Sequence, residues 1–189
     1  MPDIGEEVTP DPVRRARFEA IAEQVFQPLQ RYLRRRAPAP DAEDALSEVM
    51  LTVWRRLDDA PDAEVLPWCY GIARRTLANQ RRGQTRHLRL VSRMEAQPQS
   101  MTTPDPADAG PDAELTTALE SLSGDDREVL RLWAWEQLEP REIAPVLGVS
   151  VNAATLRLSR ARARLGEALA RQDRSISGHQ SVEGTQEAR

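Results

Sequence analysis

The sequence predicts an all-α protein in which a flexible linker joins two small helical domains. Apolar residues recur every three or four positions through most of the chain, which is helical spacing. Residues 97–111 lack this period and are rich in proline and small polar residues, so they divide the chain. Near the C-terminus, Leu147-Gly148-Val149 separates two helical segments, as in a helix-turn-helix. We expect that domain to be winged-helix-like but without a wing.

The periodic and polar stretches define five segments. Both ends of the chain are polar or acidic and without apolar period, so we expect them to be disordered. The expected segments are a disordered N-terminus at 1–12, a helical domain at 13–95, the linker at 96–112, the helix-turn-helix domain at 113–171 and a disordered tail at 172–189.

The first domain contains three predicted helices. The first ends near Ala37-Pro38-Ala39-Pro40, and Pro28 inside it should kink or break it. Asp41 is the expected N-cap of the second helix, which leads to Leu57. The third runs from about Val65 to Gln84. Their apolar stripes are Phe18, Ile21, Val25, Phe26, Leu29, Tyr32 and Leu33; Leu46, Val49, Met50, Val53, Trp54 and Leu57; and Leu66, Cys69 or Tyr70, Ala73 and Leu77.

The second domain is predicted to begin with a helix over about Asp112–Leu122. Ser123, followed three residues later by Asp126, resembles a capping box for the next helix. Ser150 is a good N-cap for the last helix. Its buried stripe should comprise Val151, Ala154, Leu158, Ala161, Leu165 and Leu169.

The other faces of the last helix carry polar and basic side chains: Asn152, Thr155, Arg157, Ser159, Arg160, Arg162 and Arg164. A glycine turn followed by a helix with an exposed arginine face is typical of a DNA-binding helix-turn-helix. The alternative is an ordinary helical hairpin whose arginine face is solvated.

Charge is unevenly distributed along the chain. The net charge is −4, and every basic side chain is arginine. Residues 72–93 contain seven arginines and no acid, whereas residues 94–126 contain eight acids and no base. Residues 141–171 hold six arginines against two glutamates. Two basic blocks of this kind indicate nucleic-acid binding despite the negative sum.

Aromatic residues stand beside the first basic block. Trp68 and Tyr70 come just before its arginines, a composition that holds single-stranded nucleic acid by base stacking and phosphate contacts. The alternative is that Trp68 and Tyr70 are core residues of a small helical domain.

The sequence gives little indication of catalysis, metal binding or membrane insertion. Glu43, Asp44 and Glu48 lack a nearby histidine, so a solvated cap or a protein-docking face is favoured over metal ligation. Cys69, the single cysteine, falls on a helical stripe, and the only histidines are His87 and His179. We expect no enzyme activity and no cofactor. No signal peptide or membrane span is predicted, which favours the cytoplasm.

Two blocks together resemble one family. EDALSEVMLTVWRRL with PWCYGIARRTLANQRR resembles region 2 of bacterial sigma factors, and DREVLRLWAWEQLEPREIAPVLGVSVNAATLRLSRARARL resembles region 4. With only a short linker between them, the layout resembles the extracytoplasmic-function (ECF) group of the sigma-70 family. The resemblance spans about Arg14 to Ala170.

The resemblance implies a subunit that binds core RNA polymerase and directs it to promoters. One surface would dock on the coiled coil of the β′ subunit, through Glu43, Asp44, Glu48, Val53, Trp54 and Arg55. A second would hold the −10 element as single-stranded DNA, through Trp68, Tyr70, Arg74, Arg75, Asn79, Arg81 and Arg82. The second domain would sit on the β flap and recognise the duplex −35 element, through Asn152, Thr155, Leu156, Arg157 and Arg160. An anti-sigma protein is a further expected partner.

The sequence departs from the family pattern at several positions. Ser47 replaces a common glutamine, Arg75 a frequent asparagine, and Glu139 a Ser or Thr cap. Pro145 lies inside the first helix of the helix-turn-helix. Leu156 lies off the buried stripe, where it should be exposed and contact a thymine methyl or an inhibitory protein.

A standalone helix-turn-helix regulator, with the first domain serving oligomerisation or effector binding, is the competing hypothesis. The basic block at residues 68–93 favours the sigma factor, because a dimerisation domain does not need it.

Overall fold

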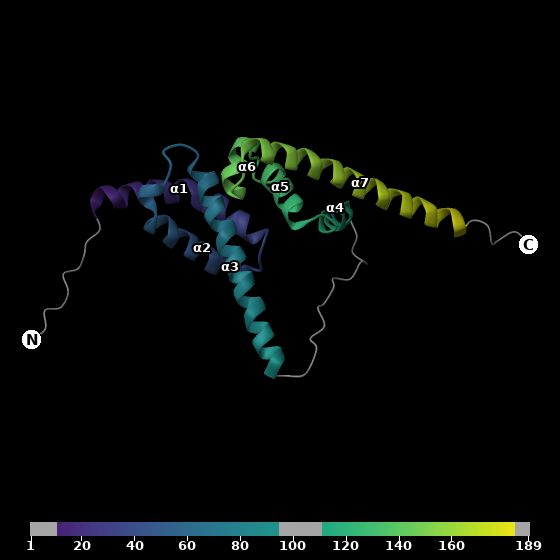
Figure 1. The fold of residues 1–189 in the computed structure, drawn as a ribbon, viewed down its shortest axis with the longest axis horizontal. Helices are drawn as coiled ribbons and strands as arrows, with labels where there is room; N and C mark the ends of the chain where they lie inside the picture. Colours follow the sequence, from purple (N-terminus) through teal and green to yellow (C-terminus); the bar gives the residue numbers. More distant parts are fainter. Residues whose placement is uncertain (1–10, 95–110, 184–189) are drawn as a thin grey trace, which may run out of the picture. The chain divides into compact units, whose positions relative to one another are not determined.

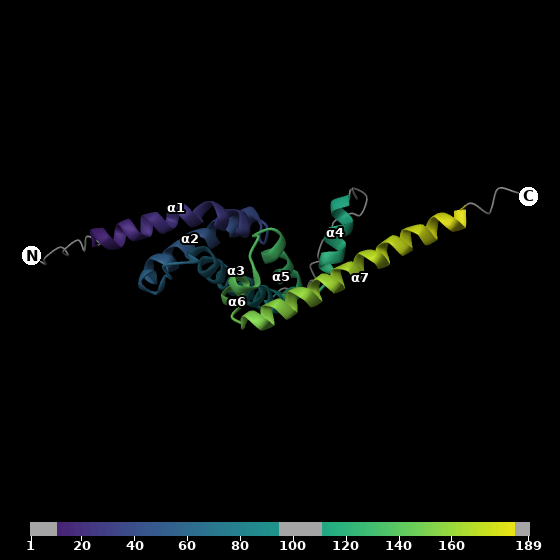
Figure 2. The same cartoon turned by 90° about the horizontal axis from the view of Figure 1, so that it is seen from above.

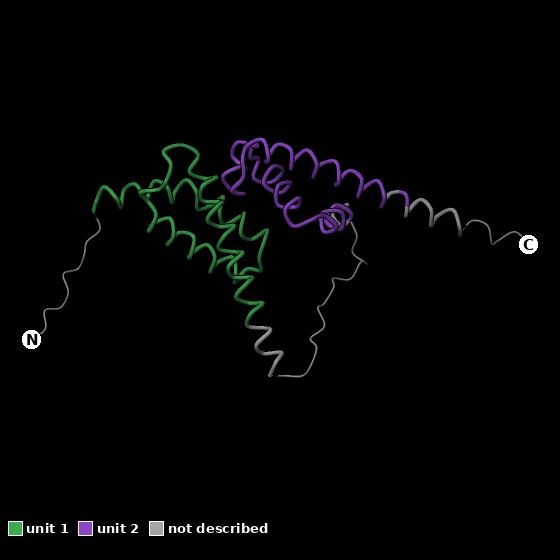
Figure 3. Tube along the Cα trace, in the orientation of Figure 1, with its two compact units in different colours: residues 1–95 green, residues 96–189 purple. Residues whose placement is uncertain are grey.

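The computed structural model describes residues 11–94 and 111–183, within which every regular element is a helix (Figure 1). The chain divides into two compact units, Met1–Glu95 and Ala96–Arg189 (Figure 3). The predicted disorder of residues 1–10, most of the predicted linker and residues 184–189 lie outside the described residues. An all-helical chain with two units agrees with the predicted fold class.

Unit 1 is a bundle in which three helices pack against one another. Figures 1 and 2 show α1 (Pro12–Arg34), α2 (Ala39–Arg55) and α3 (Val65–Met94). The 3-10 turn η1 (Leu57–Asp59) lies between α2 and α3 in the chain. The core consists of fully buried side chains from all of them, including Val25, Leu29, Tyr32, Leu33, Val49, Val53, Leu57, Cys69 and Ala73. These are mainly the residues of the predicted stripes. Phe26 is an exception, at 41% exposed.

Helix α1 runs without a break through Pro28, so of the two predicted outcomes, a kink or a break, the break is wrong. Proline lacks an N–H, and one backbone hydrogen bond is therefore missing at this point. Val25, Leu29 and Leu33 are completely buried around it. Burial of this apolar stripe against α2 and α3 offsets the loss of a single hydrogen bond.

The start of α2 and the end of α3 also differ from expectation. Helix α2 begins at Ala39 with Pro38 as its N-cap, so Asp41 lies in the first turn rather than at the cap. There its carboxylate accepts a hydrogen bond from Nε2 of Gln84 at 3.1 Å. Helix α3 continues to Met94, beyond the predicted end near Gln84. Residues 84–94 contain no proline, so elongation meets no barrier.

Unit 2 is organised around its last helix. Figure 2 shows α7 (Val151–Glu183) as the longest helix of this unit, and α4 (Pro111–Glu120), α5 (Gly124–Ala134) and α6 (Pro140–Leu147) each contact it. Buried side chains include Ala118, Val129, Leu132, Ile143, Val146, Ala154, Leu158, Ala161 and Ala168. Alanines on α7 let α5 and α6 approach closely, which packs a small core.

Local caps place the helix-turn-helix. Ser123 caps α5 by accepting the N–H of Asp126 at 3.1 Å, and Ser150 accepts the N–H of Ala153 at 3.2 Å. Gly148 ends α6 in the left-handed region, with φ of 68°. Each of these follows the predicted cap or turn. The carboxylate of Glu142 accepts the N–H of Glu139 at 2.8 Å, which strengthens the cap at the position where Glu139 replaces Ser or Thr.

Helix α7 is longer than predicted. It continues to Glu183, so residues 172–183 are helical where a disordered tail was expected. Residues 151–183 contain no proline, and adding residues to an existing helix avoids the cost of a new nucleus. At the other end, Val151 is 48% exposed and does not belong to the buried stripe. It occupies the first turn, which extends beyond the core.

Candidate nucleic-acid interface

The start of α7 presents an exposed face of mixed polar and apolar side chains. Asn152, Thr155 and Arg160 are exposed, and Leu156 is 50% exposed. The predicted exposure of Leu156 is thus confirmed. The Thr155 hydroxyl donates to the carbonyl of Val151 at 2.9 Å. Donors beside a methyl group and an isobutyl group can recognise both base edges and thymine methyls in a major groove.

Three other arginines of α7 make contacts within unit 2. Arg157 is half-buried, and its Nη1 lies 3.7 Å from Oδ2 of Asp125. Arg164 forms an ion pair with Asp126. The guanidinium of Arg162 lies 4.6 Å from the ring centroid of Trp133, a cation–π contact. The arginine face therefore divides into side chains tied to α5 and side chains, such as Arg160, that project from the unit.

In unit 1, α3 carries the second basic surface. Arg75, Asn79, Arg81 and Arg82 are exposed, and Arg74 is half-buried. The guanidinium of Arg81 donates to the carbonyl of Arg36 at 2.8 Å, and Arg82 donates to the side-chain oxygen of Asn79. Each of these contacts fixes one guanidinium nitrogen of an exposed arginine. The structure thus groups the predicted basic residues on one helix.

The two aromatic candidates beside this surface separate into different environments. Tyr70 is 2% exposed, and its ring packs against Tyr32 with centroids 4.8 Å apart. Neither face of the Tyr70 ring is open to a base, so this prediction is corrected and Tyr70 is a core residue. Trp68 is half-buried, with the guanidinium of Arg56 5.9 Å from its ring centroid. The residues differ because helical positions two apart point about 200° apart.

The candidate docking surface on α2 is also divided. Glu43, Asp44, Glu48 and Arg55 are exposed, and Glu43 forms a weak ion pair at 3.9 Å with Arg34. Val53 is completely buried and cannot contact a partner in this fold, which corrects its assignment.

Trp54 occupies an intermediate position on α2. It is half-buried, with an edge-to-face contact to Phe18 at 5.3 Å and the guanidinium of Arg14 5.3 Å from its ring. Arg14 also pairs with Asp58 at 2.6 Å and donates to the Trp54 carbonyl at 2.9 Å. The N-terminal turn of α1 therefore fixes the end of α2. The sequence alone did not indicate this role of Arg14.

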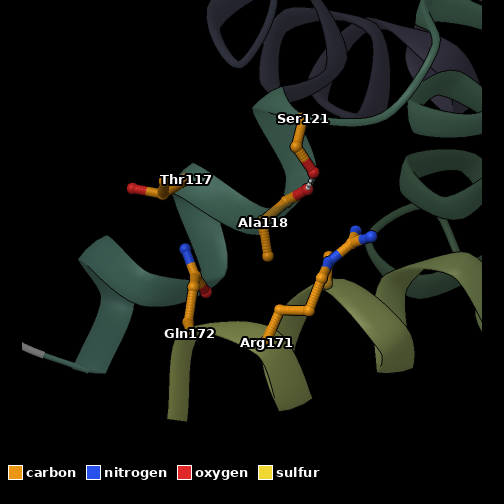
Figure 4. A pocket seen from close by; sticks show the side chains of 6 residues that line it. Thr117, Ala118, Ser121, Arg171 and Gln172 are labelled. Atoms are coloured by element: carbon orange, nitrogen blue, oxygen red, sulfur yellow. Dashed lines mark hydrogen bonds between the residues drawn. The ribbon is translucent and has the colours of Figure 1, made fainter. Parts of the chain in front are cut away.

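An open pocket of about 300 Å³ lies between α4 and α7 in unit 2. Figure 4 shows Arg171 and Gln172 of α7 beside Ala118 of α4 and Ser121, the residue that follows α4, with the Ser121 hydroxyl donating to the Ala118 carbonyl at 2.7 Å. None of the predicted site residues lines this pocket. It is the polar edge of the α4–α7 contact.

Across residues 11–94 and 111–183, no three His, Cys, Asp or Glu side chains are grouped as metal ligands would be. In the same part of the chain, no helix has the length and apolar character that a membrane span requires.

Sequence reasoning missed the partners of the arginines. The sequence predicts only a capping role for Asp126, yet Asp126 pairs with Arg164 of α7, and Asp125 beside it pairs with Arg157. The contact of the Arg56 guanidinium with the Trp68 ring was likewise not predicted from the sequence. The acids were visible in the sequence, but pairing across more than thirty residues depends on how α5 packs on α7.

The geometry defines a class of helical DNA-binding protein in which a helix-turn-helix unit and a separate arginine-rich helical unit stand on one chain. Comparison with models of known protein families identifies the family within this class. The model for sigma-70 region 2 matches residues 21–87, and the model for sigma-70 region 4 matches residues 112–165. The chain belongs to the sigma-70 family of bacterial RNA polymerase sigma factors, in its ECF group.

Individual relatives agree with the family models. The RNA polymerase sigma factor CarQ of Myxococcus xanthus is 35% identical over 133 residues, covering 68% of this chain and 74% of CarQ. The RNA polymerase sigma-E factor of Streptomyces avermitilis is 30% identical over 158 residues, covering 82% of this chain and 87% of that factor.

A solved structure shares the fold. The sigma factor RpoE, in its complex with the anti-sigma factor NepR from Bartonella quintana, matches with a TM-score of 0.60 at 22% identity. The match covers 81% of this chain and 96% of RpoE. The chain is accordingly an RNA polymerase sigma factor that directs promoter recognition and transcription initiation.

Proposed function

We propose that the two units act on different parts of the promoter through the side chains that their folds leave exposed. Unit 2 recognises the duplex −35 element through the first turns of α7, and unit 1 holds the melted −10 element through α3. The observation that carries this proposal is the exposed face of α7 directly after the Gly148 turn. Its members are Asn152, Thr155, Leu156 and Arg160, with Arg157 at its edge.

The −10 contacts are assigned to the basic face of α3. Arg74, Arg75, Asn79, Arg81 and Arg82 would hold phosphates and bases, with Trp68 as the stacking platform. Arginine donors and an aromatic face suit single-stranded DNA because stacking and charge need no base pair. Tyr70 is left out, since its ring is in the core.

The polymerase contacts are assigned to the exposed acids of α2. Glu43, Asp44 and Glu48, with Arg55 and the outer edge of Trp54, would dock on the β′ coiled coil. Exposed carboxylates on one helix fit a basic partner surface and steer its approach. Val53 contributes to the core beneath them. Unit 2 would also rest on the β flap.

An anti-sigma protein is proposed as the inhibitory partner. Support comes from the sigma factor RpoE, which shares this fold and was solved with the anti-sigma factor NepR. Exposed Leu156 on the DNA-facing side of α7 offers such a protein an apolar contact. We also propose that the chain works in the cytoplasm, where polymerase acts, and that it performs no catalytic step itself.

Reconstituted transcription tests the proposal directly. Purified core polymerase is mixed with the full chain and a library of promoter DNA, and open complexes are detected by permanganate reactivity of unpaired thymines. Open complexes that require the chain are the expected result. Binding to duplex DNA without any open complex on the library would instead favour a standalone regulator.

A further inference from the structure

Two consecutive aspartates at the start of α5 each contact an arginine of α7. Asp125 lies 3.7 Å from Arg157, and Asp126 pairs with Arg164. The two arginines are seven residues apart, which is about two helical turns, so they lie on the same side of α7. This side faces α5, whereas Asn152, Thr155 and Leu156 face away from the core.

The two pairs differ in exposure. The side chain of Asp126 is 7% exposed and that of Arg164 is 56% exposed, so this pair ties α7 to the core. The side chain of Asp125 is 61% exposed and that of Arg157 is 33% exposed. The Asp125–Arg157 pair therefore lies at the border between the core and the exposed face of α7. Its guanidinium is the basic group closest in sequence to the exposed Leu156.

We propose that Asp125 is a positioning residue that orients the Arg157 guanidinium for base recognition in the −35 element. This inference rests on the proposed role of Arg157. A guanidinium has five N–H donors in a planar fork, and a carboxylate on one side leaves the other donors for a guanine edge. The ion pair restricts the rotamers of Arg157 before DNA binds, which reduces the entropy lost on binding.

The charge of Asp125 has a second effect. A carboxylate beside the DNA-facing surface repels phosphates, so it lowers affinity for duplexes in which Arg157 finds no matching base. Asp125 should thus increase sequence discrimination and decrease non-specific affinity. If Asp125 only joined α5 to α7, removing its carboxylate would not selectively change either the sequence discrimination or the non-specific affinity.

The test uses holoenzyme made from core polymerase and the full chain, with a duplex promoter library randomised over the −35 element. Bound sequences are compared for the unchanged chain, Asp125→Ala, Asp125→Asn and Arg157→Ala. Glu120→Ala is the matched control, because it removes one exposed acid from unit 2 without touching an α7 arginine. Asparagine has nearly the size and polarity of aspartate but no charge, so Asp125→Asn remains informative if the alanine variant unfolds, as judged by circular dichroism.

Arg157→Ala should abolish preference at one base pair. Both Asp125 variants should weaken preference at that same pair, by about threefold to tenfold, and bind unrelated duplex as well or better. Glu120→Ala should leave the preference unchanged. If Arg157→Ala alters preference but both Asp125 variants keep it, the positioning role is overturned while the proposed function stands. If Arg157→Ala itself leaves all preferences intact, the assigned role of Arg157 fails, and the inference fails with it.

Discussion

Asp126 is 5% exposed, and its carboxylate pairs with the guanidinium of Arg164, which lies two helices later in the chain. The N–H of Asp126 is also bound by the Ser123 hydroxyl. The same residue therefore helps to start α5 and to hold α7 against it. Since α7 carries the proposed −35 contacts, this pair links the stability of the core to the placement of the DNA-facing helix.

Removing the two members of this pair should have unequal effects. Arg164→Ala leaves a buried carboxylate without its partner, so we expect a loss of about 1–3 kcal/mol in the free energy of unfolding. Asp126→Ala leaves Arg164 in water and should cost less. Urea unfolding of the two variants and of the double variant measures this. Equal losses would mean that Asp126 is solvated in the Arg164 variant.

Asp44→Ala should weaken binding to core polymerase without changing stability. Asp44 is exposed on α2, and its carboxylate has no ion pair with any described residue. Affinity for core polymerase, measured by fluorescence anisotropy of the labelled chain, should fall by about threefold or more. Glu23→Ala, an exposed acid on α1, is the control. Unchanged affinity for Asp44→Ala would remove this carboxylate from the docking surface.

Trp68 and Tyr70 should respond differently to truncation. Trp68→Ala should weaken binding of holoenzyme to a single-stranded −10 oligonucleotide by about 1–3 kcal/mol while the unit stays folded. Tyr70→Ala removes a buried ring packed against Tyr32 and should cost about 3–5 kcal/mol of stability. Thermal unfolding and oligonucleotide binding separate the two effects. Full binding by a folded Trp68→Ala chain would contradict the stacking role.

Two glycines of unit 2 should give opposite results when replaced by alanine. A Cβ would meet nothing within 4 Å at either Gly148 or Gly166, so only the backbone conformation matters. Gly148 has φ of 68°, and alanine there should cost about 1–2 kcal/mol. Gly166 is inside α7, where alanine should stabilise by up to about 1 kcal/mol. Denaturant midpoints measure both changes. A stabilising Gly148→Ala would show that the turn can adopt another conformation.

Stability should fall at alkaline pH because of Cys69. Burial raises the pKa of this thiol from 9.0 to about 12. The folded chain holds the proton more tightly than the unfolded chain. This contribution to stability is therefore complete below about pH 9 and is lost as the pH rises towards 12. The slope it adds approaches about 1.4 kcal/mol per pH unit.

Cys69→Ala provides the measurement of that slope. The substitution removes the thiol, so its free energy of unfolding should decline less steeply with pH between about 9.5 and 10.5 than that of the unchanged chain. The small cavity it leaves shifts all values together and does not alter the slope. Urea unfolding at several pH values gives both curves. Parallel curves would mean that the thiol ionises alike in the folded and unfolded chains.

The sequence by itself determined the features that depend on local interactions. Helical spacing, the Ser123 and Ser150 caps and the turn at Gly148 are set within a few residues, since each involves one backbone group and its near neighbours. The exposure of Leu156 follows from its angular position on one helix. The resemblance to two sigma-factor regions was also visible in the sequence, because each region is a continuous stretch of the chain.

Only the tertiary structure decided how the helices share their faces. It placed Tyr70 and Val53 in the core and kept Trp68 half-exposed, because each depends on which neighbouring helix covers that side. The tertiary structure also keeps α1 continuous through Pro28, because packing of its apolar stripe outweighs one absent hydrogen bond. It also brought Asp125 to Arg157 and Asp126 to Arg164. Pairing between distant residues is fixed by helix packing, and no spacing along the chain encodes it.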